Sequence, residues 1–121
     1  MTTLTKIAGP NPIGPGLKMA VYSLLWDSNY PTGGEIVNIS GEFTKCYAII
    51  PSGNDTLADN GYSFAGVFDY TATVTATNVK ISVNWEKNPA DGGGADIAFP
   101  EFTNTGDLSS IGQFMFTVIG K

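Results

Sequence analysis

Residues 16–40 read GLKMAVYSLLWDSNYPTGGEIVNIS, and this stretch decides the fold class. Residues 17–27 predict one long strand, which a Pro-Gly turn connects to a second, shorter strand. The long strand is apolar on both faces: Leu17, Met19, Val21 and Leu25 on one, and Ala20, Tyr22, Leu24 and Trp26 on the other. A strand with one face in water alternates apolar and polar residues, so two apolar faces indicate cover on both sides. The cover is either a second sheet or another protein.

The two faces of this strand receive different expected roles. We assign Met19, Val21 and Leu25 to the core. We place the other face nearer to an interface with another chain, through Tyr22, Leu24 and Trp26. No convergent polar or charged groups accompany the strand, which disfavours a ligand site there.

The rest of the chain continues the β pattern. No window of ten or more residues has helical periodicity, and short apolar segments are separated by Gly and Pro. The clearest alternation places Val79, Ile81 and Val83 on one face of a strand. Roughly seven or eight short strands at this spacing predict an all-β protein, either an antiparallel β-sandwich or a jelly-roll-like barrel. Residues 17–121 are expected to form this single β domain.

The first sixteen residues, MTTLTKIAGPNPIGPG, hold three of the seven prolines. Proline lacks a backbone donor and has a fixed φ, so this segment cannot be a helix or a central strand. We predict an extended N-terminal arm over residues 1–16. One interpretation is a disordered terminus. The other is an arm that lies across a neighbouring chain through Leu4, Ile7 and Ile13.

Charge excludes two classes of partner. Charged residues make up 14% of the 121 residues, against a usual share of about 25%. All six basic residues are lysines, eleven residues are acidic, and the net charge is −5. Nucleic acids and anionic membranes require a basic surface, so neither is expected as a partner. No apolar run reaches the length of a membrane span, and no signal peptide is predicted.

The residue types needed for catalysis are scarce. Histidine, the usual general base and the commonest metal ligand, is absent. Cys46 is the only cysteine, so the chain has no intramolecular disulfide and no thiolate cluster for zinc. We expect Cys46 to be a small buried residue on a strand. The sequence predicts no enzymatic activity, no catalytic residues and no cofactor.

The carboxylates offer one weak candidate for a metal site. Asp55 and Asp59 lie four residues apart, and Asn54 and Asn60 flank them with further oxygen ligands of the kind that Ca²⁺ prefers. The segment lacks the alternating ligand spacing and the distal Glu of an EF-hand loop. A solvated turn is therefore the preferred interpretation, and no metal site is predicted.

Two tryptophans raise the alternative of a carbohydrate-binding module, in which exposed aromatic rings stack on sugars. Trp85 is in phase with Ile81 and Val83, which favours a core position. Trp26 ends the long strand, where a core or interface role is favoured over a ligand role.

Three segments occur in an order that resembles a family of small structural proteins of tailed bacteriophages: GLKMAVYSLLWDSNYPTGGEIVNIS, GYSFAGVFDY and TGDLSSIGQFMFTVIGK. Members of that family share a G-L-K-M start to the first long strand, a Y-x-T-G-G-E turn, and an ending in which D-L-S precedes R-V-x-V-I-G-K. The matching residues here are 16–19, 30–35 and 107–121. The chain departs from the pattern at Gln113-Phe114-Met115-Phe116, where the family more usually carries Arg and Val.

The resemblance implies a capsid decoration (cement) protein that binds the outside of the phage head and stabilises it. The implied partner is the major capsid protein, and the implied location is the virion surface after assembly in the host cytoplasm. Self-association is also implied, with a homotrimer as one arrangement. The alternatives are a head-fibre or tail component of the virion, and a carbohydrate-binding β-sandwich module.

Overall fold

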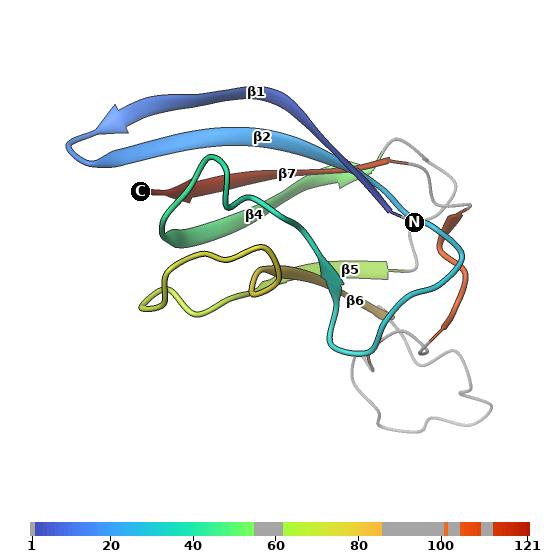
Figure 1. The fold of residues 1–121 in the computed structure, drawn as a ribbon. Coiled ribbons are helices and arrows are strands. Elements are labelled where there is room, and N and C mark those ends of the chain that lie inside the picture. Colours follow the sequence, from blue (N-terminus) through green and yellow to red (C-terminus); the bar gives the residue numbers. More distant parts are fainter. Residues whose placement is uncertain (1, 55–61, 86–100, 102–104, 110–112) are drawn as a thin grey trace.

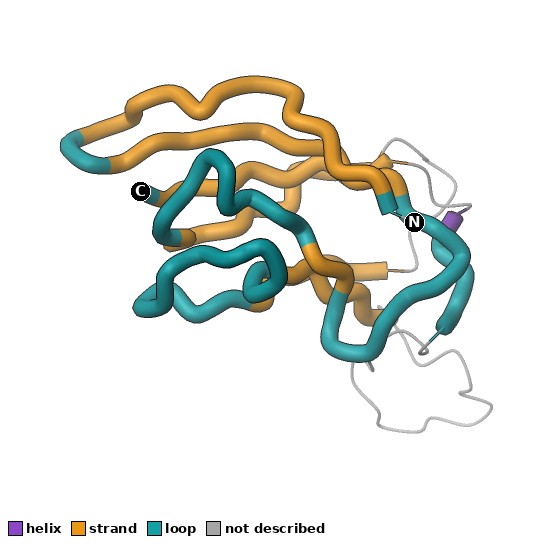
Figure 2. Tube along the Cα trace, viewed as in Figure 1, coloured by secondary structure: helices purple, strands orange, loops and turns teal. Residues whose placement is uncertain are grey.

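The computed structural model describes residues 2–54, 62–85, 101, 105–109 and 113–121, which form two β-sheets packed face to face (Figure 1). The four-stranded sheet has the order β1-β2-β7-β4 and contains β1 (Thr3–Gly14), β2 (Leu17–Leu25), β7 (Gln113–Gly120) and β4 (Cys46–Asn54). The three-stranded sheet has the order β3-β6-β5 and contains β3 (Glu35–Ile36), β6 (Lys80–Trp85) and β5 (Tyr62–Val67). Loops join the strands at both ends (Figure 2). All the pairings are antiparallel, which confirms the predicted all-β, sandwich-like fold.

Residues 3–14 are extended, as predicted, but they belong to the sheet. β1 pairs with β2 from Thr3 opposite Leu25 to Gly14 opposite Leu17, so residue 16 marks a hairpin turn and not the boundary of a separate arm. The register shifts three times along β1, in the stretch that contains Pro10 and Pro12. Prolines fit an edge strand, whose outer N–H groups have no partner in the ladder. Such irregularities also protect an edge against pairing with other chains.

The face of β2 that lies in the core is not the face that was assigned to the core from the sequence. Ala20, Tyr22, Leu24 and Trp26 are each 4% exposed or less, whereas Met19 and Leu25 are exposed. The buried face meets β7 through Phe114, Phe116 and Val118 and the second sheet through Val79, Ile81 and Val83. The larger aromatic side chains fill the space of about 10 Å between two stacked sheets. The assignment of Met19, Val21 and Leu25 to the core was therefore wrong.

Stacked aromatic rings join the two sheets. The ring centroids of Phe64 on β5 and Phe114 on β7 lie 4.2 Å apart, and Trp26 lies 5.9 Å from Phe64. Tyr22 stacks on Phe116 at 5.6 Å. Aromatic pairs at these separations add stability beyond the area that they bury. Trp26 and Phe114 thus hold the four-stranded sheet against Phe64 of the other.

β4 extends further than the sequence suggested. A proline after the apolar segment at 45–50 predicts that the strand stops at Pro51, yet Pro51 lies opposite Phe116 and β4 continues to Asn54. β4 is at the edge of its sheet, where a residue without an N–H is tolerated. Cys46, at the start of β4, is buried as predicted, and burial raises the pKa of its thiol to about 11. The segment at 95–99, whose pattern before Pro100 predicts a further short strand, lies outside the described residues.

Candidate interaction surfaces

The four-stranded sheet has a second face, opposite the one that contributes Tyr22, Phe114 and Phe116 to the core; on it Ser23 is buried and several larger side chains are exposed. Residues that oppose one another across neighbouring strands share a face. We call this surface the outer face; by register and by the alternation along β2 it contains Thr3, Thr5, Ala8, Asn11, Leu17, Met19, Val21, Ser23, Leu25, Ala48, Ile50, Gln113, Met115, Thr117 and Ile119. No residue of this set is charged. Four large apolar side chains on it, those of Met19, Leu25, Ile50 and Met115, are 36–48% exposed.

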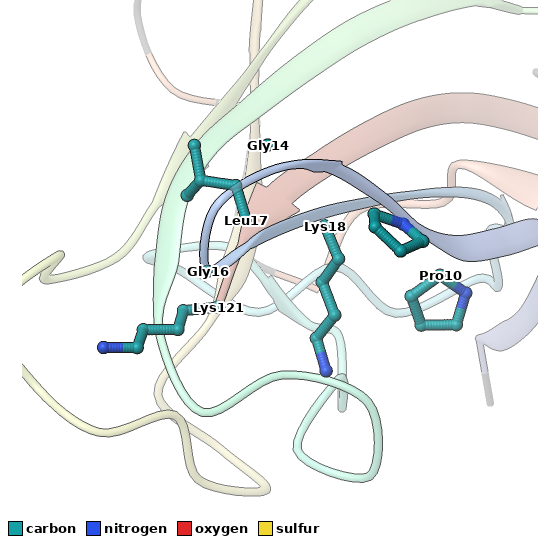
Figure 3. A pocket seen from close by; sticks show the side chains of 7 residues that line it. Pro10, Gly14, Gly16, Leu17, Lys18 and Lys121 are labelled. Carbon is teal, nitrogen blue, oxygen red and sulfur yellow. The ribbon is translucent and has the colours of Figure 1, made fainter.

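The second candidate surface lies at the turn between β1 and β2. Figure 1 shows this hairpin extending past the end of β7. Ile7 and Ile13, on β1, are 53% and 45% exposed, and each sits at a shift in the register with β2. Pro12 and Gly14, the neighbours of Ile13 in the sequence, line a hollow of about 390 Å³ together with Pro10, Gly16, Leu17, Lys18 and Lys121 (Figure 3). Ile7 lies three residues before Pro10 on the same strand. We call Ile7, Ile13 and this hollow the hairpin site.

The lining of the hollow includes two lysines and no acidic residue. Lys18 Nζ lies 5.3 Å from the centre of the Phe43 ring, a cation–π contact that holds the side chain against the domain. Lys121 extends in a different direction from Lys18 (Figure 3). The two ammonium groups therefore do not converge on one point. The hollow offers an apolar, proline-rich surface with positive charge at its margin, in a chain whose net charge is −5.

The structure divides the residues expected at an interface. Ile7 and Ile13 are accessible to another molecule. Leu4 is half-buried and packs against the core. The side chains of Tyr22, Leu24 and Trp26 lie between the sheets, so they cannot reach a partner unless the sheets separate. For these three, core packing replaces the expected interface role.

The exposed members of the outer face were missed as interaction residues because the sequence analysis assigned three of that face's β2 residues to the core. A signal was nevertheless present. In QFMFTVIG the aromatic residues Phe114 and Phe116 alternate with Met115 and Thr117. The bulkier set of an alternating strand is the stronger candidate for the core, which leaves Met115 outside. The residues that lie opposite Met115 on β2 and β4 then belong to the outer face as well.

Burial removes Trp26 as a residue that could stack on a sugar. Trp26 packs against Phe64 and Phe114, which leaves no ring face for a sugar. The side chain of Trp85 lies outside the described residues. No observation on the described part of the chain favours the carbohydrate-binding alternative.

Two buried tyrosines differ in how their hydroxyl groups are satisfied. Tyr30 OH donates to Glu101 Oε1 at 2.9 Å and accepts from the backbone N–H of Val83 at 3.0 Å. Tyr22 OH is buried and has no hydrogen-bond partner among the residues that the structure describes. Burial raises the pKa of both phenols to about 12, with the carboxylate of Glu42 adding to the effect at Tyr22. Both hydroxyls stay neutral at physiological pH.

The same substitution at these two positions is expected to have opposite effects. Tyr22→Phe removes a buried polar group without a partner and should raise the free energy of unfolding by about 1 kcal/mol. Tyr30→Phe leaves the Val83 N–H without its acceptor and should lower it by about 2 kcal/mol. Urea unfolding followed by circular dichroism measures both changes. Equal losses for the two variants would contradict the hydrogen-bond assignment.

The loop with Asp55, Asp59 and Asn60, considered above for Ca²⁺, lies outside the described residues. Within the described part of the chain, no three His, Cys, Asp or Glu side chains are grouped as a metal ion requires. That part also contains no helix of the length and apolarity needed to cross a bilayer.

Comparison of the chain with protein-family models, with curated proteins and with solved structures finds no match.

Proposed function

We propose that the protein is a non-enzymatic structural protein of a tailed-phage virion, which binds the outer surface of the head and stabilises it. The resemblance of the segments at 16–40, 61–70 and 105–121 to virion proteins supports the class of function. The hairpin site is the observation that carries the binding part of the proposal. Two large aliphatic side chains, Ile7 and Ile13, are exposed on an irregular edge strand, and the residues on either side of Ile13 line a hollow.

The hairpin site suits a protein partner with a particular chemistry. Ile7, Ile13 and the prolines of the hollow offer apolar surface, and Lys18 and Lys121 place positive charge at its margin. A segment that fits carries an apolar side chain and a nearby carboxylate. We place such a segment on the exposed surface of the major capsid protein. Rim charges of this kind steer association more than they add affinity.

The stabilising effect follows from repetition. Removal of about 100 Å² of apolar surface from water contributes about 2.5 kcal/mol as an upper limit. A capsid presents the same site many times, so a modest contact at each site sums to a large effect on the whole shell. A decorating protein therefore needs only a small binding surface, such as that around Ile7 and Ile13.

The experiment is a co-sedimentation assay with expanded empty heads of the phage that encodes the protein. The wild-type protein should bind at a saturating copy number and raise the temperature at which the heads disrupt. The double variant Ile7→Ser/Ile13→Ser should bind at least about tenfold more weakly, since it removes two apolar contacts.

The matched control is Ile36→Ser/Val67→Ser, which removes two side chains of similar exposure, 42% and 44%, from the three-stranded sheet. This control should bind heads as the wild type does. The proposal fails if the wild type does not bind heads, or if both double variants bind equally well. Binding to purified tails in place of heads would assign the protein to the tail.

A further inference from the structure

The outer face is a continuous uncharged surface on a charged protein. Met19 and Leu25 on β2, Met115 on β7 and Ile50 on β4 are exposed on it, with Val21 and Ile119 half-buried between them. We propose that the outer face packs against the same face of a second copy, so that two molecules form a face-to-face dimer. The outer face adjoins the hairpin site at Leu17, but this inference rests on other residues and does not depend on the proposed function.

Charge is the first reason for choosing a second copy as the partner. Each chain carries a net charge of −5, so two copies repel one another wherever their charged surfaces meet. The outer face has no charged residue among the positions that the register assigns to it. It is therefore a surface on which two copies can meet without placing like charges in contact. A basic partner, by contrast, would be recognised by acidic side chains, which this face lacks.

Shape is the second reason. β-sheets share one hand of twist, and two twisted sheets pack face to face with their strands about 30° apart. Two copies of one sheet have the same twist, so this packing is available to them without any change in the backbone. The exposed methionines at positions 19 and 115 add to the fit, because an unbranched thioether side chain adapts to an irregular surface.

The area of the face is the third reason. Four strands spaced about 4.8 Å apart, paired over about eight residues of about 3.3 Å each, cover roughly 500 Å². Two copies would bury roughly 1,000 Å², which is the lower limit for a specific protein interface. An interface of this size predicts a reversible dimer with a dissociation constant on the order of 1–100 µM.

Contact between identical faces also determines the symmetry. Two copies that use the same patch are related by a twofold axis, and such a contact closes on itself. The outer face therefore produces a dimer and not the trimer considered from the sequence.

Sedimentation velocity of the full chain between about 1 and 200 µM tests the proposal, since this range spans the expected dissociation constant. The sedimentation coefficient of the wild type should rise from that of a monomer to that of a dimer. Met115→Glu, which places a carboxylate at the contact in both copies, should weaken the dimer at least about tenfold. The control Val67→Glu introduces the same charge at similar exposure on the three-stranded sheet and should leave the dimer unchanged.

A second measurement works without a variant. Hydroxyl-radical oxidation of Met19 and Met115 should be slower at 200 µM than at 1 µM, concentrations at which the dimer is respectively populated and dissociated. The oxidation of Tyr70, which is exposed elsewhere, should not change with concentration. A wild-type protein that stays monomeric at the highest concentration overturns the proposal.

The head-binding assay separates this proposal from the previous one. If the protein forms a dimer but does not bind heads, the dimer proposal stands and the proposed function fails. If the protein stays monomeric and binds heads through Ile7 and Ile13, the proposed function stands and the dimer proposal fails. A monomer whose head binding is lost in Met115→Glu would show that the outer face contacts the capsid, and that result also overturns the dimer.

Discussion

Phe114→Ala is expected to lower the free energy of unfolding by about 3–5 kcal/mol, the usual cost of removing a buried phenylalanine ring. Phe114 is fully buried on β7 and contacts the rings of Phe64, Trp26 and Phe116. Its loss removes the aromatic link between the two sheets and leaves a cavity that the backbone cannot close. Equilibrium unfolding in urea, with the slope of the transition compared between proteins, measures the loss.

Met115→Ala is the matched control, because Met115 is the next residue along β7 and points to the outer face. Met115→Ala should lower the free energy of unfolding by about 1 kcal/mol or less, as is usual for substitutions at partly exposed positions. The protein concentration should be below the expected dissociation constant of the dimer, so that association does not add to the measured stability. Equal losses for Phe114→Ala and Met115→Ala would show that the inner and outer faces of β7 are wrongly assigned.

Gly120→Ala is expected to lower the free energy of unfolding by roughly 3 kcal/mol or more, at or above the upper range for overpacking. Gly120 ends β7 opposite Cys46, and a Cβ there would collide with the carbonyl oxygen of Lys45 and lie 2.8 Å from the Phe43 ring. The backbone cannot yield easily, because Lys45 and Lys121 exchange hydrogen bonds of 3.0 and 3.1 Å beside it. Thermal unfolding measures the effect.

Gly41→Ala serves as the control for this substitution. Nothing lies within 4 Å of a Cβ built at Gly41, and its φ is not positive. The variant should be as stable as the wild type or slightly more stable, because alanine reduces the entropy of the unfolded chain. A Gly120→Ala protein with wild-type stability would mean that the ends of β4 and β7 lie further apart than described.

The two proposed contacts adjoin at Leu17 but depend mainly on different strands. The hairpin site depends on β1, an edge strand whose prolines and register shifts keep it from extending another sheet. The outer face depends on the side chains of the central strands β2 and β7 with β4. Because β2 pairs with both β1 and β7, packing of the core supports both surfaces. Core variants such as Phe114→Ala should therefore be used only as stability probes and not as tests of binding.

The sequence alone determined the class of the fold and the chemical limits on function. Strict alternation at Val79, Ile81 and Val83 predicted a half-buried strand, and those three side chains are in the core. A single cysteine in an apolar segment predicted the buried thiol of Cys46. The absence of histidine and of arginine is a property of composition and needs no structure. Such features depend on the types of residue and on their local alternation, both of which can be read directly from the sequence.

Only the tertiary structure decided how β2 is oriented, where residues 3–14 belong, and how far β4 extends. A period of two shows which residues of a strand share a face, but when both faces are apolar it does not show which one is inside. That choice depends on the aromatic volume that Phe64, Phe114 and Phe116 contribute from distant parts of the chain. Likewise, Pro10, Pro12 and Pro51 are compatible with strands only because β1 and β4 are edges. Pairing between distant segments decides which strands are edges. This information is not present in residues 16–40 alone.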